Sequence, residues 1–367
     1  MGPEEVKMGL HGASTCPVTL DGVVVPADNL LGEEGKGHRV AFNVLNVGRF
    51  KLAAACLGGM RPAIGVAARY AVERKAFGRR LADFSLIGAK LAAMATRTYA
   101  VESVVYRIGG LLDASLAAAE DASSPVAIRT ALEEYAVECS LAKVLASEEL
   151  GYVVDELVQV HGGYGYIDAY PASTAYRDAR IHRIWEGTNE VNRLLVPGTL
   201  LKRAMAGRLD LLGPARRAQE TLLGGQLPSF DGALAGEEAA VAAVRAVALL
   251  LAGAAVQRFG TGLDQEQEVL GGIADLAIDL FAMESAVERA KGAADPLHHD
   301  LARLVVAERA GSVEQRAKRL AAGLAEGDEA RTLVAGIRRL LRTEPVDQIA
   351  LGRRVAAAVV ARAAYPV

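Results

Sequence analysis

Apolar residues recur at helical spacing along most of this chain. The longest pattern runs from about 38 to 77 and covers roughly ten turns of helix. The same spacing predicts a second long helix over about 85–116 and a third over about 124–160. Glycine costs roughly 1 kcal/mol inside a helix, so the pair Gly58 and Gly59 in the first helix predicts that another backbone packs closely there.

Residues 1–37 follow a different pattern. The run from Pro17 to Pro26 is rich in β-branched residues, contains Asp21-Gly22 and has a proline at each end. These features predict two short strands joined by a tight turn.

The composition changes again beyond Gly207. Pro214, the pair Gly224-Gly225 and residues 228–236 predict a linker. The segments after the linker are rich in Ala, Leu and Arg. These segments predict a second set of helices at about 236–260, 267–293, 297–323, 327–343 and 345–363. No motif in residues 210–367 carries recognisable chemistry.

Composition and charge support a mainly α-helical protein. Apolar residues make up 51% of the 367 positions, enough for sizeable cores, and aromatic residues are few. A formal charge of −3 and a pI near 6.1 give no electrostatic case for nucleic acid as a partner.

The most apolar window, Ala239 to Val256, is interrupted by Arg245, which favours a buried helix over a membrane span. The N-terminus has no pattern typical of a secretory signal.

The cysteines and histidines do not predict a metal site. Cys16, Cys56 and Cys139 are far apart and odd in number, so we expect buried thiols in a reducing compartment. His161 and His182 lack a third and fourth ligand at a recognisable spacing.

The densest candidate chemistry lies between Gln159 and Leu195. Trp185, the only tryptophan of the chain, directly precedes Glu186, and a Gly-Thr break follows. A carboxylate between a bulky aromatic residue and a glycine can have its pKa raised by apolar walls, as a base that removes a carbon-bound proton requires. The alternative for Glu186 is a solvated residue at a helix boundary.

This segment resembles the signature of the acyl-CoA dehydrogenases. In that family a Q-x-x-G-G-x-G turn precedes an aromatic-E-G-T-[NS]-[EQ] turn at a fixed separation, which is far more specific than a lone glycine motif. The matching residues are Gln159, Gly162, Gly163, Gly165, Glu186, Gly187, Thr188, Asn189 and Glu190.

The N-terminal stretch resembles the last strands of the family's middle β-domain, where K-x-G-x-x-x-S-x-T precedes V-x-V-P-x-x-N-x-L-G. Ala13 stands where that pattern has its Ser. The likeness is carried by Lys7, Gly9, Thr15, Val23, Val25, Pro26, Asn29, Leu31 and Gly32. Because the family has a helical domain and most of a β-barrel before this point, we expect the chain to be a fragment, a product with a misplaced start, or half of a split protein.

The resemblance implies FAD-dependent α,β-dehydrogenation of long-chain acyl-CoA to trans-2-enoyl-CoA in fatty-acid β-oxidation, with Glu186 as the base. Some branches of the family take the base from the position before the substrate-contacting Arg, which here is Gly48 and cannot act as one. The implied substrate contacts are Asn46, Arg49, Trp185 and Gly187. The implied FAD contacts are Arg74, Phe77, Gln159, Gly162, Gly163, Thr188, Asn189 and Glu190.

The resemblance also implies partners. Arg74 matches a residue that meets the cofactor diphosphate across a dimer interface, so a homodimer is expected, with an electron-transfer flavoprotein-like acceptor. We expect a cytoplasmic bacterial protein, in which an arginine-bearing helix around 303–319 is a candidate for weak contact with the inner membrane surface. A solvated face is the favoured alternative for that helix.

The expected organisation has three parts. Residues 1–37 are a remnant of the β-domain, and residues 38–206, with further helices over 173–184 and 188–206, form an up-and-down four-helix bundle. Residues 210–367 form an extra helical domain, as in the very-long-chain branch of the family, or serve only as packing mass. Two other functions stay open: a non-catalytic assembly or scaffold protein on the same fold, and an acyl-CoA oxidase.

Overall fold

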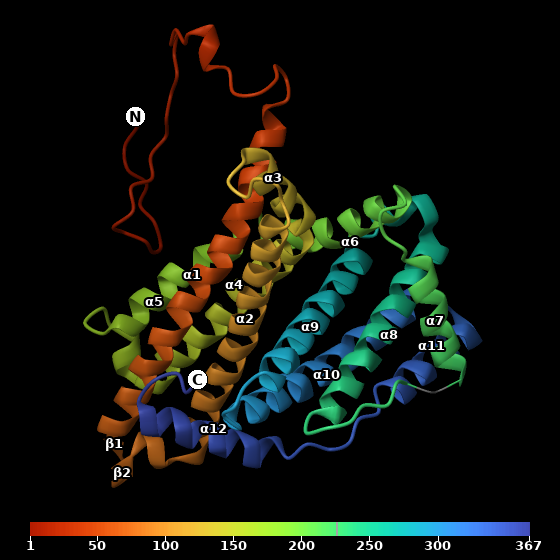
Figure 1. The fold of residues 1–367 in the computed structure, drawn as a ribbon. Helices are drawn as coiled ribbons and strands as arrows, with labels where there is room; N and C mark the ends of the chain where they lie inside the picture. Colours follow the sequence, from red (N-terminus) through yellow and green to blue (C-terminus); the bar gives the residue numbers. More distant parts are fainter. Residues whose placement is uncertain (225–226) are drawn as a thin grey trace.

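The fold is built almost entirely of α-helices (Figure 1), and the computed structural model describes residues 1–224 and 227–367. Three long helices, α1, α2 and α4, pack against one another, and α5 and α6 pack on α4. The helices of this bundle are α1 (Gly37–Glu73), α2 (Ser85–Ala117), α3 (Pro125–Glu134), α4 (Ala136–His161), α5 (Pro171–Ala179) and α6 (Asn189–Met205). The predicted mainly helical bundle is confirmed.

A second helical domain packs on one side of this bundle. Its helices are α7 (Leu212–Gly224), α8 (Ala235–Phe259), α9 (Gln267–Lys291), α10 (Leu297–Leu324), α11 (Gly327–Leu340) and α12 (Gln348–Arg362). Helix α9 lies against α2 and α6, and α12 crosses the end of α2 and touches α1 (Figure 1). The apolar core is therefore continuous from the bundle into the second domain.

Local sequence explains where several of these helices start and stop. The Ser124 hydroxyl accepts a hydrogen bond from the Ala127 N–H at 3.1 Å, and Pro125 occupies the first helical position of α3, where a missing N–H costs nothing. Thr188 caps α6 in the same way. Helix α4 ends at His161, and the next residue, Gly162, has a left-handed φ of 58° that favours glycine.

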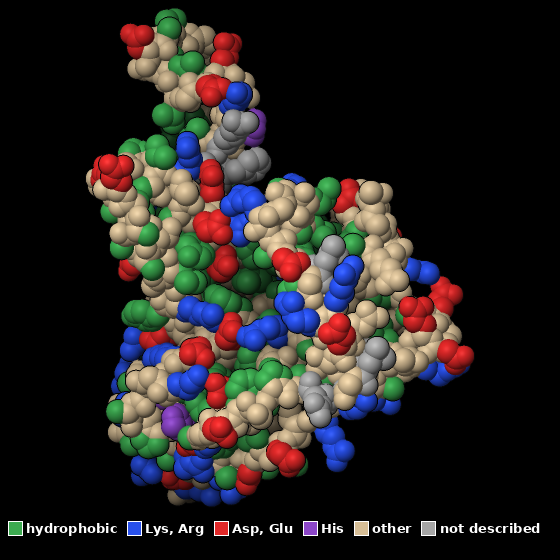
Figure 2. All heavy atoms as spheres, turned by 45° about the vertical axis from the view of Figure 1, so that its right-hand side comes forward, with side chains coloured by type: hydrophobic (Ala, Val, Ile, Leu, Met, Phe, Trp, Pro, Cys, Tyr) green, Lys and Arg blue, Asp and Glu red, His purple; other side chains and the backbone are tan. Residues whose placement is uncertain are grey.

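The two strands predicted within residues 17–26 are not formed. A strand needs a neighbour to pair its backbone N–H and C=O groups, and this run projects away from the helical body (Figures 1 and 2). In the described part of the chain the only sheet pairs β1 (Lys75–Ala76) with β2 (Arg79–Arg80), antiparallel. The turn between them places Phe77 and Gly78 at φ 52° and 81°.

Two helix predictions and the linker prediction need correction. The helix expected over 124–160 is broken at Tyr135, which separates α3 from α4, and the helix expected over 173–184 ends as a 3-10 turn over Arg180–Arg183. Part of the predicted linker is helix α7, because Pro214 lies in its first turn, where proline is tolerated. Gly225 of that linker lies outside the described residues.

The glycine pair in α1 does not mark a close backbone contact. A Cβ atom built at Gly58 would meet nothing within 4 Å, and one at Gly59 would meet only the Leu150 side chain, at 3.4 Å. The prediction of another backbone at this point was wrong.

Helix α8 belongs to a segment, Ala235–Gln265, that is long and apolar enough to cross a membrane by length and composition alone. In its most apolar window 56% of the residues are buried inside the protein, against α7, α9 and α10. Core helices of soluble proteins pass the same test, so this property is weak evidence for a membrane span.

Candidate active site

Glu186 lies in a tight turn between the 3-10 turn Arg180–Arg183 and helix α6. Glu186 has a φ of 59° and Gly187 a φ of 77°, both left-handed. Glycine adopts this conformation freely, but for glutamate it costs on the order of 1–2 kcal/mol. The turn must therefore be held by its surroundings.

Three side chains hold the carbonyl groups of this turn. Arg49 Nε donates to the Glu186 carbonyl at 3.2 Å, from helix α1. Asn192 Nδ2 donates to the Gly187 carbonyl at 2.8 Å, from helix α6. Lys143 Nζ donates to the same Gly187 carbonyl at 2.8 Å, from helix α4. Three helices thus converge on one turn.

The carboxyl group of Glu186 rests against helix α1 at Gly48. A Cβ atom built on Gly48 would lie 2.5 Å from Cδ and 2.7 Å from Oε1 of Glu186, so only glycine leaves room for the carboxyl group in this position. Arg49 and Asn46 are both buried, and Arg49 Nη1 donates to Asn46 Oδ1 at 3.0 Å. Burial lowers the pKa of the Arg49 guanidinium, and the nearby Cys139 and Glu186 counteract that effect. The structure therefore brings Glu186 together with Asn46 and Arg49.

Trp185 faces away from the core and is 42% exposed. Its ring stacks on His182, with ring centroids 5.2 Å apart and planes 22° apart. This stacking covers one face of the indole, and part of the side chain is open to solvent.

Lys143 was not predicted as a site residue, although it is 0% exposed and touches the turn directly. Its ammonium group also donates to Asn189 Oδ1 at 2.7 Å. Burial lowers its pKa from 10.5 to about 8. The available sequence signal was a lone lysine between Leu141, Ala142, Val144 and Leu145, on a helix whose other positions there are apolar.

Raising the pH from about 8 to 10.5 is expected to stabilise the native protein relative to a Lys143→Met variant. In that window the folded chain has lost the Lys143 proton and the unfolded chain retains it, so the unfolded state binds more protons and stability rises with pH. Urea unfolding at several pH values measures this difference. Parallel stability curves for the two proteins would contradict the lowered pKa.

A second group of predicted residues lines a hollow at the far end of α4. Arg74, Gln159, Gly162 and Gly163 all lie in its wall. A Cβ atom built on either glycine would meet nothing within 4 Å, so the backbone there is open to close approach. The Arg74 guanidinium lies over the Tyr164 ring, 5.6 Å from its centroid. An open glycine backbone beside a guanidinium suits an anionic group such as a diphosphate.

The predicted cofactor residues therefore fall at two separate places. Lys143, beside the Glu186 turn, and His161, beside the hollow, are separated along α4 by about 27 Å at roughly 1.5 Å per residue. Phe77 is 96% exposed on the β1–β2 turn and touches Phe84 edge-on, with centroids 6.2 Å apart. One copy of the chain does not gather all these residues around one point.

The first residues of α6 and its cap residue differ in which of their groups are free to contact a cofactor. The Thr188 hydroxyl caps the helix by accepting from the Val191 N–H at 3.3 Å, and Glu190 is exposed. Asn189 is buried, and its side chain bonds to Lys143 and Ser147. Asn189 could therefore contact a cofactor only through its backbone, and this contact stays a prediction.

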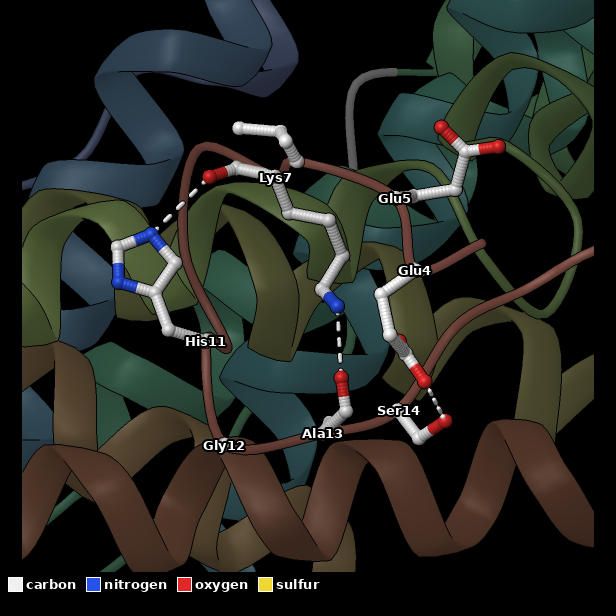
Figure 3. Close-up of a pocket in the computed structure, with 8 residues that line it drawn as sticks. Glu4, Glu5, Lys7, His11, Gly12, Ala13 and Ser14 are labelled. Atoms are coloured by element: carbon white, nitrogen blue, oxygen red, sulfur yellow. Dashed lines mark hydrogen bonds between the residues drawn. The ribbon is translucent and has the colours of Figure 1, made fainter. Parts of the chain in front are cut away.

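The N-terminal loop encloses another hollow, shown in Figure 3, which is lined by none of the predicted site residues. The Ser14 hydroxyl donates to Glu4 Oε1 at 2.5 Å, and Lys7 Nζ donates to the Ala13 carbonyl at 2.6 Å. His11 contacts the Lys7 carbonyl at 3.0 Å. These polar groups bond within the loop itself.

Cys56 and Cys139 are buried free thiols, and Cys16 is half-buried. Burial raises the pKa of Cys56 and of Cys139 to about 12, so neither is an activated nucleophile. Within residues 1–224 and 227–367, no group of three or more His, Cys, Asp and Glu side chains is placed to hold a metal ion.

Most of the chain matches models of one protein family. Two family models, both described as "Acyl-CoA dehydrogenase, C-terminal domain", match residues 35–201 and residues 243–339. The chain belongs to the acyl-CoA dehydrogenase family.

Individual known proteins also support this membership. The chain is 44% identical over 377 residues to a "Probable acyl-CoA dehydrogenase" of Bacillus subtilis, covering 100% of this chain and 63% of the relative. It is 34% identical over 309 residues to the human mitochondrial "Very long-chain specific acyl-CoA dehydrogenase", covering 79% and 45%. A crystal structure of an acyl-CoA dehydrogenase complexed with FAD from Bacillus anthracis matches with a TM-score of 0.96 and 41% identity, covering 100% of this chain and 64% of that one. The chain thus spans less than two thirds of the length of these relatives.

Proposed function

We propose that the protein containing this chain oxidises long-chain acyl-CoA thioesters to trans-2-enoyl-CoA, with Glu186 as the base that removes the α-proton. The observation that carries this proposal is the placement of the Glu186 carboxyl group against Gly48, in a turn whose Glu186 carbonyl accepts a hydrogen bond from the buried Arg49. A base must be held in one orientation to meet a carbon-bound proton, and a turn fixed from three helices provides that constraint.

The residues around the turn would bind the substrate and stabilise the charge that develops on it. Asn46, Arg49, Trp185 and Gly187 would contact the substrate, and the backbone N–H of Glu186 would hold the thioester oxygen as negative charge develops on it. Arg49 would add positive charge on the same side, although its Nε already holds the Glu186 carbonyl.

FAD is the cofactor that fits these residues, and when bound it would accept the hydride that no side chain can accept. Arg74, Gln159, Gly162 and Gly163 would hold its diphosphate, because the glycine backbone is open and Arg74 supplies the charge. Phe77 would lie beside them, and Thr188, Asn189 and Glu190 would contact FAD at the other end of α4. Two groups about 27 Å apart along a helix favour a homodimer, in which each FAD meets residues of both copies.

The choice of long acyl chains rests on the human very-long-chain relative, whose matched region includes most of this chain. We propose an electron-transfer flavoprotein as the electron acceptor and the bacterial cytoplasm as the location, with α10 as the candidate for membrane-surface contact. These points extend the proposal and do not affect the assignment of Glu186.

The test is anaerobic titration of the purified, FAD-supplemented protein with palmitoyl-CoA, with butyryl-CoA as the matched short-chain substrate. We expect palmitoyl-CoA to bleach the visible flavin absorbance faster than butyryl-CoA does. Bleaching followed by rapid peroxide formation in air would indicate an acyl-CoA oxidase instead. A protein that binds FAD but is not bleached by either thioester would support the scaffold alternative.

A further inference from the structure

A continuous set of polar contacts joins the C-terminal helical domain to the Glu186 turn. It starts at Asp275 on α9, whose Oδ1 accepts a hydrogen bond from Arg193 Nε at 2.8 Å. Arg193 lies on α6, one turn after the helix begins, and its other two nitrogens donate to the two carboxyl oxygens of Glu148, at 2.8 and 3.0 Å. A bidentate guanidinium bond fixes both distance and orientation, so Arg193 links α9 to α4 in one geometry.

The contacts continue from Glu148 into the turn. Glu148 Oε1 accepts from Asn189 Nδ2 at 3.1 Å, and Asn189 is the first residue of α6. Asn189 Oδ1 in turn accepts from Lys143, which donates to the Gly187 carbonyl. Burial alone would raise the pKa of Glu148, but its bonds to Arg193 and Asn189 lower it, so the carboxylate stays charged at neutral pH.

This connection matters because Glu186 cannot hold its own conformation. Its left-handed φ is unfavourable for any residue other than glycine. The side chains that bind the carbonyls of the turn must also be held in place by their own contacts. Asn189 and Lys143 are buried; the Asn189 side chain bonds to Ser147 and to Glu148, and both carboxyl oxygens of Glu148 are bound by Arg193. Of the groups bonded to Arg193 in the described chain, only Asp275 comes from the C-terminal domain.

We propose that Asp275 is a positioning residue for the Glu186 turn, through which helix α9 of the C-terminal domain sets the geometry of the candidate base. The inference rests on the proposed function only in calling Glu186 the base. The coupling itself is a property of the folded chain, and it gives residues 210–367 a role beyond packing.

The test uses Trp185, the only tryptophan of the chain and the direct neighbour of Glu186, as a reporter. Asp275→Asn is expected to red-shift its emission and increase its quenching by acrylamide, because the loosened turn exposes the indole further. The matched control is Glu284→Gln, which also lies on α9 and also pairs across the domain junction, with Arg107 at 2.9 Å, but is not connected to the turn by these contacts. The control is expected to leave Trp185 emission unchanged.

Two further variants test the route of the coupling. Asp275→Glu keeps the charge and is expected to restore wild-type emission. In an Arg193→Gln background Asp275→Asn is expected to add no further change, since the link is already cut. Circular dichroism of each variant confirms that it is folded.

Wild-type Trp185 emission in Asp275→Asn, or an equal change in Glu284→Gln, would overturn the proposal. In the active enzyme Asp275→Asn is also expected to lower kcat about tenfold with little change in KM, as a misplaced base would. If the wild type shows no dehydrogenase activity, the proposed function fails, but the fluorescence result still decides whether α9 positions the turn.

Discussion

Replacing Glu186 by Gln is expected to lower the rate of flavin reduction by palmitoyl-CoA by about 10³-fold, within the 10²–10⁴-fold that general base catalysis contributes. Glutamine has nearly the same shape but cannot take up a proton. The turn should persist, because Arg49 and Asn192 bind its backbone carbonyls and not the Glu186 side chain. Anaerobic stopped-flow absorbance measures the rate, and the visible spectrum shows that flavin content is unchanged.

Two comparison variants make this result specific. Glu190→Gln removes a carboxylate four residues further on, and there we expect a change in FAD affinity rather than in the rate of reduction. Gly48→Ala leaves the carboxyl group intact but places a methyl group where Glu186 Cδ lies 2.5 Å away, so the base must move and the rate should fall. Undiminished reduction by the Glu186→Gln protein would remove the assignment of the base.

Sequence periodicity predicted the long helices well because their burial repeats every three to four residues. The ends of α2 and of α9 lie within two residues of the predicted boundaries. Local preference wrongly predicted two strands within residues 17–26, since a strand forms only where another strand pairs with it. Helix α7 was not predicted because a proline such as Pro214 usually indicates a linker, and only the structure shows that it lies in the first turn of a helix.

The candidate site could be predicted only in part. Motif spacing predicted Glu186 and Arg49 as site residues, and the structure places them in contact through the Glu186 carbonyl. The spacing did not indicate Lys143, which lies more than forty residues earlier, or Asp275, which lies in another domain. Such residues act through side-chain contacts that depend on how whole helices pack, and no local pattern records those contacts.

Another cluster at the domain junction is expected to control stability. Arg309 on α10 donates to Glu149 on α4 at 2.7 Å and to Asp279 on α9 at 2.7 Å, and its side chain is only 12% exposed. Arg97 on α2 also pairs with Glu149, and Arg316 pairs with Asp279. Acidic and basic side chains are likewise interspersed over the face of the molecule in Figure 2. A buried pair is costly to break because removal of one partner leaves the other charge without compensation.

Arg309→Met is therefore expected to lower the free energy of unfolding by about 3 kcal/mol, the lower end of the range for a broken buried pair, because Arg97 and Arg316 still compensate part of the charge. Arg258→Met is the matched control: its pair with Glu326 is largely exposed, so its loss should cost less than about 1 kcal/mol. Urea unfolding followed by circular dichroism measures both values. Equal losses in the two variants would show that the buried cluster contributes no more than a surface pair. Two-step unfolding of Arg309→Met would show that the cluster also couples the two helical domains into one cooperative unit.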